Sequence, residues 1–414
     1  MNARIPRNDT SPMPTAKRPP AADRARPTDR VPPGRSRRWA WLGAAVTGSV
    51  ALSACGATIT PMTFDSIPPA SSTTLPATLQ PTPTLPLVSA TTQPATAAAA
   101  WVDATANLVG HPAQCGGTTL VSVRPTGDRV LVGLSANGLY ASDDGSAQWT
   151  QLAGSKKVDN RPSSILYDPD HPATFWESGA YGKAVYDSTN DGASMSVVGN
   201  IDHSDQVSVD FTEPSRRTML SGTHEKAQVF RSTDGGRSWV DLSRSLPAGV
   251  GYASFPYVVN ASTFLLGTRR GTSAGIFRSS DGGQTWKLLQ QGAVDGPVAV
   301  TADGHLYWLL AGGTRLLQSG DSGATWTESD HSGPVSGLIA LPGNRLAALG
   351  AQNVVVSSDR GATWTAVGGP LPYAPDGLAY SAARKSFYVW HSSCTVGANS
   401  PITAKAVMRL PAGI

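Results

Sequence analysis

The stretch Ser232–Trp239, with the sequence STDGGRSW, decides the fold because it recurs along most of the chain. Its form is Ser-x-Asp-x-Gly-x-Ser/Thr-Trp. Three more copies keep every fixed position: SSDGGQTW at Ser279–Trp286, SGDSGATW at Ser319–Trp326 and SSDRGATW at Ser357–Trp364. Two earlier copies keep the register but depart at two positions each. SDDGSAQW at Ser142–Trp149 has Ser146 for Gly and Gln148 for Thr, and STNDGASM at Ser188–Met195 has Asn190 for Asp and Met195 for Trp. The starts are 46, 44, 47, 40 and 38 residues apart, a spacing typical of one four-stranded propeller blade per repeat.

Each copy has the chemistry of a tight turn between two strands. Gly236 tolerates the positive φ that such a turn requires. Ser232 and Asp234 have short polar side chains, which hydrogen-bond nearby backbone N–H groups and lock the turn. Trp239 opens the outgoing strand, where its large ring can be buried. We therefore predict a hairpin at every repeat.

The repeats resemble the Asp-box, or bacterial neuraminidase repeat, of sialidases, sortilin-type receptors, xyloglucan-active endoglucanases and photosystem II assembly-factor propellers. The resemblance covers residues 101–414 and implies a structural turn on the outer rim, between the third and fourth strands of a blade. It assigns a structural and not a catalytic role to the repeat residues Ser142, Asp144, Trp149, Ser188, Asn190, Gly192, Ser232, Asp234, Gly236, Trp239, Ser279, Asp281, Gly283, Trp286, Ser319, Asp321, Gly323, Trp326, Ser357, Asp359, Gly361 and Trp364.

The repeats also set the number of blades. Six four-strand units are expected at 117–153, 162–200, 205–245, 251–291, 296–331 and 335–370. Three further strand-like runs, Asp376–Tyr380, Ser386–His391 and Ala404–Leu410, lack a fourth strand. Trp101-Val102-Asp103 resembles the strand that follows a repeat and would complete this blade. The prediction is an all-β, seven-bladed β-propeller of four-stranded antiparallel blades, closed by its N-terminal strand.

The N-terminal segment has the pattern of an export signal. Arg35-Ser36-Arg37-Arg38 precedes an uncharged apolar run, Trp39–Ala54. Its sixteen residues make about 24 Å of helix, less than the roughly 30 Å that a stable transmembrane helix needs. Leu52-Ser53-Ala54-Cys55-Gly56 resembles the bacterial lipobox, so we predict a lipid on Cys55 and an anchor on the extracytoplasmic face of a bacterial cell membrane. The Sec and twin-arginine export routes both stay open.

Composition divides the rest of the chain. We expect a disordered leader at 1–34, the signal peptide at 35–54, a Pro/Thr-rich linker at 55–100 and the propeller at 101–414. Residues 1–54 contain ten of the 33 Lys and Arg but three of the 29 Asp and Glu. The remainder is therefore slightly acidic, which argues against a nucleic-acid partner.

The remaining two cysteines fall near the predicted closure of the ring. Cys115 follows the closing strand, and Cys394 follows the second strand of the same blade. An exported compartment is oxidising, so we predict a Cys115–Cys394 disulfide, with two free buried thiols as the alternative.

No catalytic, cofactor-binding or metal residue can be assigned from the sequence. The Arg4-Ile5-Pro6 tripeptide matches a sialidase motif but precedes the signal, and the seven histidines are scattered singly. Asp168, Asp170 and Asp210 are the candidates for a glycosidase carboxylate pair.

Two arginine pairs, Arg216-Arg217 and Arg269-Arg270, are interpreted as corresponding points of blades three and four. They form either a patch for an acidic partner or ordinary solvated turns.

The sequence predicts a monomeric, lipid-anchored binding or assembly module with a protein or glycan ligand at the cell envelope and no cofactor. The alternatives are a secreted glycoside hydrolase, sialidase-like or xyloglucanase-like, and a structural envelope protein without a specific ligand.

Overall fold

A computed structural model describes residues 99–108, 117–158, 161–182, 185–199, 201–329, 335–391 and 405–412. Cys55, Cys115 and Cys394 lie outside these residues, as do the predicted leader, the signal peptide and all but the end of the linker. In the part of the chain that is described, no helix is both long and apolar enough to cross a bilayer.

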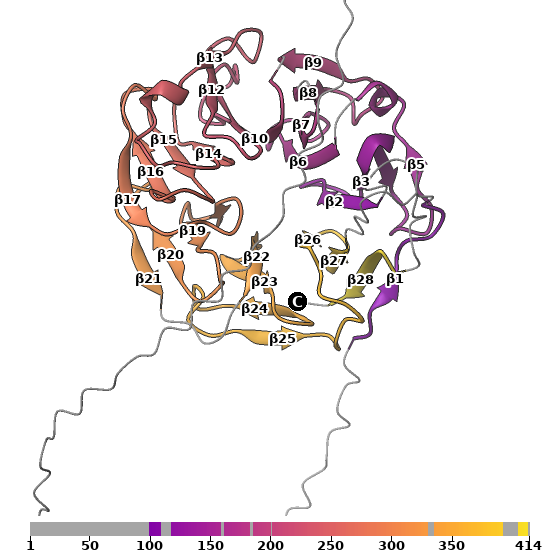
Figure 1. Cartoon of the computed structure of the whole chain (residues 1–414). Helices are drawn as coiled ribbons and strands as arrows, with labels where there is room; N and C mark the ends of the chain where they lie inside the picture. Colours follow the sequence, from indigo (N-terminus) through magenta and orange to yellow (C-terminus); the bar gives the residue numbers. More distant parts are fainter. Residues whose placement is uncertain are drawn as a thin grey trace, which may run out of the picture. The chain divides into compact units, whose positions relative to one another are not determined.

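Seven four-stranded antiparallel sheets are arranged in a ring, as predicted (Figure 1). Blade 1 contains β2 (Thr118–Val123), β3 (Val130–Leu134), β4 (Leu139–Ser142) and β5 (Thr150–Gln151). Blade 2 contains β6 (Arg161–Tyr167), β7 (Phe175–Ala180), β8 (Val185–Ser188) and β9 (Ser196–Gly199). Blade 3 contains β10 (Ser204–Val209), β11 (Met219–Thr223), β12 (Val229–Ser232) and β13 (Val240–Asp241).

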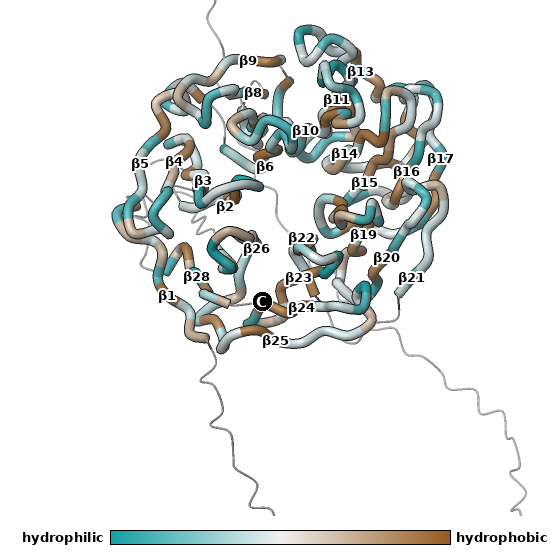
Figure 2. The backbone as a smooth tube through the Cα atoms, turned by 180° about the vertical axis from the view of Figure 1, so that it is seen from behind, coloured by the Kyte–Doolittle hydropathy of each residue, from teal (hydrophilic) through white to brown (hydrophobic). Residues whose placement is uncertain are grey.

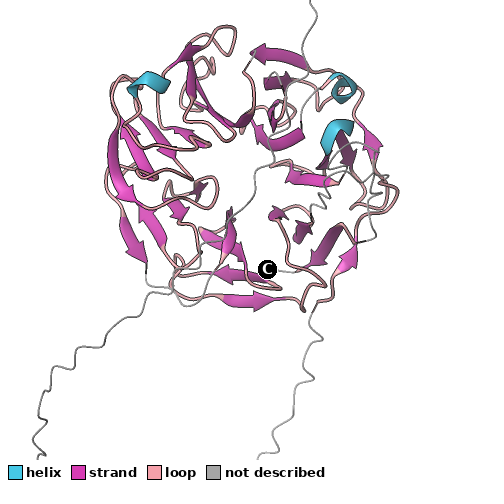
Figure 3. Cartoon of the chain, in the orientation of Figure 1, coloured by secondary structure: helices cyan, strands magenta, loops and turns pink. Residues whose placement is uncertain are grey.

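The next three blades repeat this order. Blade 4 contains β14 (Phe255–Val258), β15 (Phe264–Gly267), β16 (Gly275–Ser279) and β17 (Lys287–Gln291). Blade 5 contains β18 (Ala299–Val300), β19 (Leu306–Leu309), β20 (Leu316–Ser319) and β21 (Thr327–Ser329). Blade 6 contains β22 (Ser336–Leu341), β23 (Arg345–Leu349), β24 (Val354–Ser357) and β25 (Thr365–Val367). Between the strands, the short 3-10 turns are η1 (Ser135–Asn137), η2 (Gly154–Lys157) and η3 (Ser243–Ser245) (Figure 3).

Blade 7 joins the two ends of the propeller. It contains β26 (Gly377–Ser381), β27 (Ser386–Trp390), β28 (Val407–Pro411) and the N-terminal strand β1 (Val102–Asp103). Val102 pairs with Arg409, and the indole N–H of Trp101 donates to the carbonyl of Gly369 at 2.8 Å. The prediction that Trp101-Val102-Asp103 completes this blade is confirmed.

The central strands are apolar because each blade packs against two neighbours. Every residue of β3, β11 and β19 is buried, so these strands do not alternate between polar and apolar side chains. Hydrophobic stretches accordingly lie in the strands (Figure 2). One core cluster joins Leu220 of blade 3 to Phe264, Phe277 and Trp286 of blade 4. The interfaces between blades therefore form the core.

All six eight-residue repeats lie between the third and fourth strands of a blade. Ser232 Oγ accepts the backbone N–H of Gly236 and donates to Asp234, each at 2.8 Å. Asp234 also accepts the N–H and O–H of Ser238, which lower the pKa of its carboxyl to about 2. The copy at Ser188–Met195 keeps this pattern, because the Asn190 amide oxygen accepts from the Ser188 hydroxyl and from the N–H of Ser194. The amide oxygen thus replaces the carboxylate in the turn.

Ser146 occupies the position that Gly fills in the other five repeats, and it adopts the same left-handed backbone, with φ of 74°. Its hydroxyl is buried and has no hydrogen-bond partner in the described residues. We expect Ser146→Gly to raise the free energy of unfolding by about 1 kcal/mol, because it removes both penalties. Denaturant unfolding measures this change. The reverse control, Gly283→Ser, should destabilise, since a Cβ there would lie 2.4 Å from Leu242 Cδ1.

Candidate functional site

Strand order gives the propeller two distinct faces. Because the strands are antiparallel, the loops between second and third strands share one face with the connections from one blade to the next. We call this the linker face. The loops between first and second strands share the opposite face with the eight-residue repeats. We call this the repeat face.

The carboxylates considered for a glycosidase lie on the repeat face and are held by other groups. Asp168 is 2% exposed and accepts two hydrogen bonds of 2.9 Å from the guanidinium of Arg216, which also contacts Asp170. This guanidinium keeps the pKa of Asp168 far below its usual range. Asp210 accepts the N–H and O–H of Thr212. These contacts join blades 2 and 3 and leave no paired acid and nucleophile among the three carboxylates.

The interpretation that the two arginine pairs occupy corresponding points is wrong. Arg216-Arg217 lies between β10 and β11, on the repeat face, whereas Arg269-Arg270 lies between β15 and β16, on the linker face. The sequence contains the signal that separates them, since Arg216 precedes its repeat by 16 residues and Arg269 precedes its repeat by ten.

The linker face carries a cluster of charged, polar and aromatic side chains that no sequence motif predicts. It lines and borders a cavity of about 310 Å³. We call the set the linker-face site; its members are Tyr181, His203, Asp205, His224, Glu225, Tyr252, Ser254, Arg269, Arg270 and Asp295. They come from the ends of β7, β11 and β15, from the starts of blades 3 to 5 and from the connections that precede them.

His224 is the centre of this site. Its Nδ1 lies 2.8 Å from Asp205 Oδ1, and its Nε2 lies 3.7 Å from Glu225 Oε1. The hydrogen bond with Asp205 raises the pKa of His224, against a smaller opposing effect of burial. The ring of Tyr181 meets the rings of His203 and His224 edge-on, at centroid distances of 5.5 and 5.4 Å.

The backbone of the site is unusual. Tyr181, His203 and Glu225 have φ values of 60°, 58° and 56°, in the left-handed region that residues other than glycine seldom adopt. Such conformations cost free energy and gather at binding and catalytic sites. Tyr181 is also 60% exposed, although it is a large aromatic side chain.

Arg269 and Arg270 are held in place by aromatic rings but are not paired with a carboxylate in the described residues. Each guanidinium carbon lies over an aromatic ring, 5.5 Å from the ring centroid: the ring of Phe255 for Arg269 and the ring of Tyr252 for Arg270. In the described part of the chain neither forms a salt bridge. Ser254 lines the same cavity and is 1% exposed, and its hydroxyl has no hydrogen-bond partner in that part. The carboxylates of the site have other partners: Asp205 and Glu225 lie against His224, and Asp295 accepts the N–H of Gly337. The site therefore offers guanidinium and hydroxyl groups to a ligand.

Within the described residues, no group of three or more His, Cys, Asp or Glu side chains is arranged to hold a metal ion.

Comparisons with known proteins agree with the architecture. The model of the DUF6242 beta propeller domain matches residues 257–378. The GH74 xyloglucanase from Xanthomonas campestris is similar, with a TM-score of 0.50 and 18% identity over 70% of this chain and 52% of that one. The extracellular domain of a hybrid two component system, BT3049, from B. thetaiotaomicron has a TM-score of 0.51 and 11% identity over 71% of this chain and 40% of that one.

YCF48 bound to D1 peptide matches 62% of this chain and 95% of that one, with 13% identity and a TM-score of 0.43. No curated protein matches the sequence. The chain spans about half the length of the xyloglucanase. What it shares with the xyloglucanase and the BT3049 domain is the β-propeller fold.

Proposed function

We propose that this chain is a monomeric binding module, held at the cell envelope by a lipid on Cys55, that takes an acidic segment of a partner protein at its linker-face site. The observation that carries the proposal is the pair Arg269 and Arg270. Both guanidinium groups are stacked on aromatic rings beside a cavity and are free of salt bridges within the described residues. Stacked guanidinium groups hold their N–H edges ready for carboxylates.

Further features support a protein partner. Exposed Tyr181 offers a rigid aromatic surface of the kind enriched at protein interfaces. The buried hydroxyl of Ser254 offers a hydrogen bond to a peptide group. The turns at the repeats support membership in the Asp-box superfamily, where we assign their carboxylates a structural role. We retain the Cys115–Cys394 disulfide as part of the proposal; both residues lie outside the described part.

Exchange of the arginine pair tests the proposed site. The full chain is crosslinked in cells, and the protein partner is recovered with it. Arg269→Gln with Arg270→Gln should reduce this recovery at least tenfold, because each lost charge-assisted hydrogen bond weakens binding by about 1.5–3 kcal/mol. The matched control is Arg237→Gln with Arg217→Gln on the repeat face. Equal recovery from the linker-face variant and the wild-type chain would refute the site.

The lipid anchor has its own test. Cys55→Ser should move the chain from the membrane fraction to the soluble fraction and abolish incorporation of labelled palmitate, since the acyl chains supply the membrane affinity. Unchanged membrane association and processing would exclude lipidation.

Binding should weaken as pH rises, because His224 is charged only below its pKa. Its pKa is raised above the ordinary value of about 6.5, so the ring is charged below that value and loses its charge as pH rises through the raised pKa. We expect the affinity for an acidic partner to fall as pH rises above about 6.5. Titration of binding against pH, with His224→Gln as the variant that flattens the curve, measures the effect.

A further inference from the structure

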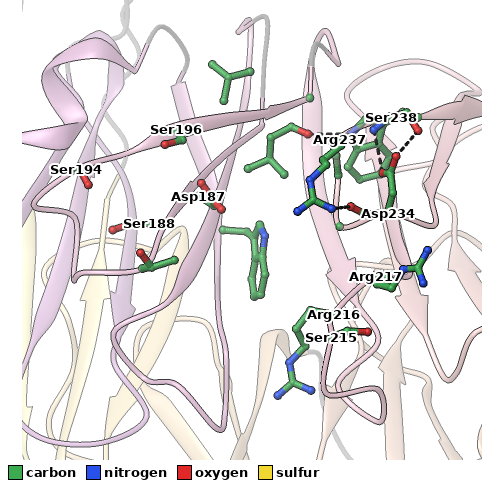
Figure 4. A pocket seen from close by; sticks show the side chains of 18 residues that line it. Asp187, Ser188, Ser194, Ser196, Ser215, Arg216, Arg217, Asp234, Arg237 and Ser238 are labelled. Carbon is green, nitrogen blue, oxygen red and sulfur yellow. Dashed lines mark hydrogen bonds between the residues drawn. The ribbon is translucent and has the colours of Figure 1, made fainter.

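A second concave surface lies on the repeat face, at the boundary between blades 2 and 3. This groove has a volume of about 990 Å³ and opens between the turns of the two blades (Figure 4). We call it the seam groove. Its blade 2 wall includes Asp187, Ser188, Ser194 and Ser196; its blade 3 wall includes Ser215, Arg217, Asp234, Arg237 and Ser238.

The seam groove exists because the chain supplies little to fill it. At this boundary and at the next one, a residue of the preceding blade packs against the repeat glycine: Val198 against Gly236 here and Leu242 against Gly283 there. At the next boundary, Ser245 Oγ in addition contacts both the Gly283 carbonyl and the Trp286 indole N–H. Leu242 and Ser245 belong to a connection of 13 residues between β13 and β14. Only four residues separate β9 from β10.

Asp187 is the distinctive group of the groove. It lies on β8, in register with Trp176 of β7 and Ser196 of β9. Burial raises the pKa of its carboxyl. In the described residues this carboxylate has no hydrogen-bond or ion-pair partner from another side chain. A half-buried carboxylate without donors is unfavourable, so a ligand can stabilise Asp187 by supplying the missing hydrogen-bond donors.

The remaining lining is balanced in charge and rich in hydroxyl groups. Arg217 and Arg237 offset Asp187 and Asp234, while Arg216 is neutralised by Asp168. Ser188, Thr189, Ser194, Ser196, Ser215 and Ser238 all line the groove. Trp239 adds partly exposed indole surface, whereas Trp176, which also lines the groove, is only 7% exposed. A polycation would meet the arginines and a polyanion the carboxylates, so neither sign of charge is favoured over the whole groove.

We infer that the seam groove binds a neutral, hydroxyl-rich oligosaccharide. Sugar hydroxyls both donate and accept, so they can donate to Asp187 and accept from Arg217, Arg237 and the hydroxyls of Ser194 and Ser196. The apolar faces of sugar rings suit indole surfaces. The groove volume is at the upper end of the range for ligand sites, which fits several linked sugar rings.

This inference does not depend on the proposed function, because the two sites lie on opposite faces. The test titrates the full chain with cellohexaose, xylohexaose and chitohexaose at roughly millimolar concentrations, by calorimetry. We expect at least one to bind, and Asp187→Asn to weaken that binding at least tenfold. Asp202→Asn, which removes an exposed carboxylate outside both sites, should leave it unchanged, as should Arg269→Gln with Arg270→Gln.

Asp187→Asn keeps the shape of the side chain and removes a charge that burial disfavours, so its melting temperature should equal or exceed that of the wild-type chain. A folded Asp187→Asn variant that binds the hexasaccharide as tightly as the wild-type chain would overturn the inference. Absence of binding by all three hexasaccharides would overturn it as well.

Discussion

Arg216→Met should lower the free energy of unfolding by about 3–5 kcal/mol, because it leaves the carboxylate of Asp168 buried without its counter-ion. Asp168 and Arg216 have side-chain exposures of 3% and 10%, and they connect blade 2 to blade 3. Denaturant unfolding at neutral pH measures the loss. Arg217→Met is the matched control, since Arg217 is exposed and makes no salt bridge in the described residues.

The same effect should depend on pH. The folded pKa of Asp168 is lowered, so its contribution to stability is present above the unfolded value of about 3.9 and is lost as pH falls through the folded pKa. The difference between Arg216→Met and the wild-type chain should therefore shrink below about pH 4. Adding Asp168→Asn to Arg216→Met should recover part of the loss. If Arg216→Met and Arg217→Met unfold alike, the pair does not stabilise the junction.

Removal of the closing strand should have an effect of similar size. A chain that begins at residue 106 lacks β1 and should lose on the order of 5 kcal/mol relative to one that begins at residue 99, at about 1 kcal/mol per lost hydrogen bond. The lost contacts include those of Ala104 N–H and Thr105 Oγ1 with the Val407 carbonyl, and that of the Trp149 indole with the Ala104 carbonyl. Thermal unfolding of the two chains measures the difference.

Loss of β1 also exposes the edge of β28. We expect the shorter chain to associate, because an uncovered edge strand pairs with other chains. Equal melting temperatures for the two chains, with both monomeric, would mean that β1 contributes little to ring closure.

The repeats made most of the fold predictable. Their turn chemistry is local: Ser232, Asp234 and Gly236 fix one hairpin without help from distant residues. Even spacing then places one blade on each repeat. The closing strand was predictable for the same reason, because Trp101 occupies the place of a repeat tryptophan.

The linker-face site was not predictable by these means. Tyr181, His224 and Arg269 lie on different blades, and only the ring brings them together. Residue offsets from the repeats contain a partial signal, since these three residues precede their repeats by seven, eight and ten positions. That interval corresponds to the loop between second and third strands. Burial of Asp168 by Arg216 depends on packing between blades, which no local pattern reports.

The central proposal is that partner proteins bind the linker face, and site-directed photo-crosslinking tests it most directly. A benzoylphenylalanine at Tyr181 in the full chain should form an adduct with a partner protein in cells. The same probe at Gln284, which is exposed in the blade 4 repeat on the opposite face, should not. The Tyr181 adduct should disappear when Arg269→Gln and Arg270→Gln are added. An adduct that persists in that variant, or one that forms equally at Gln284, would contradict the proposal.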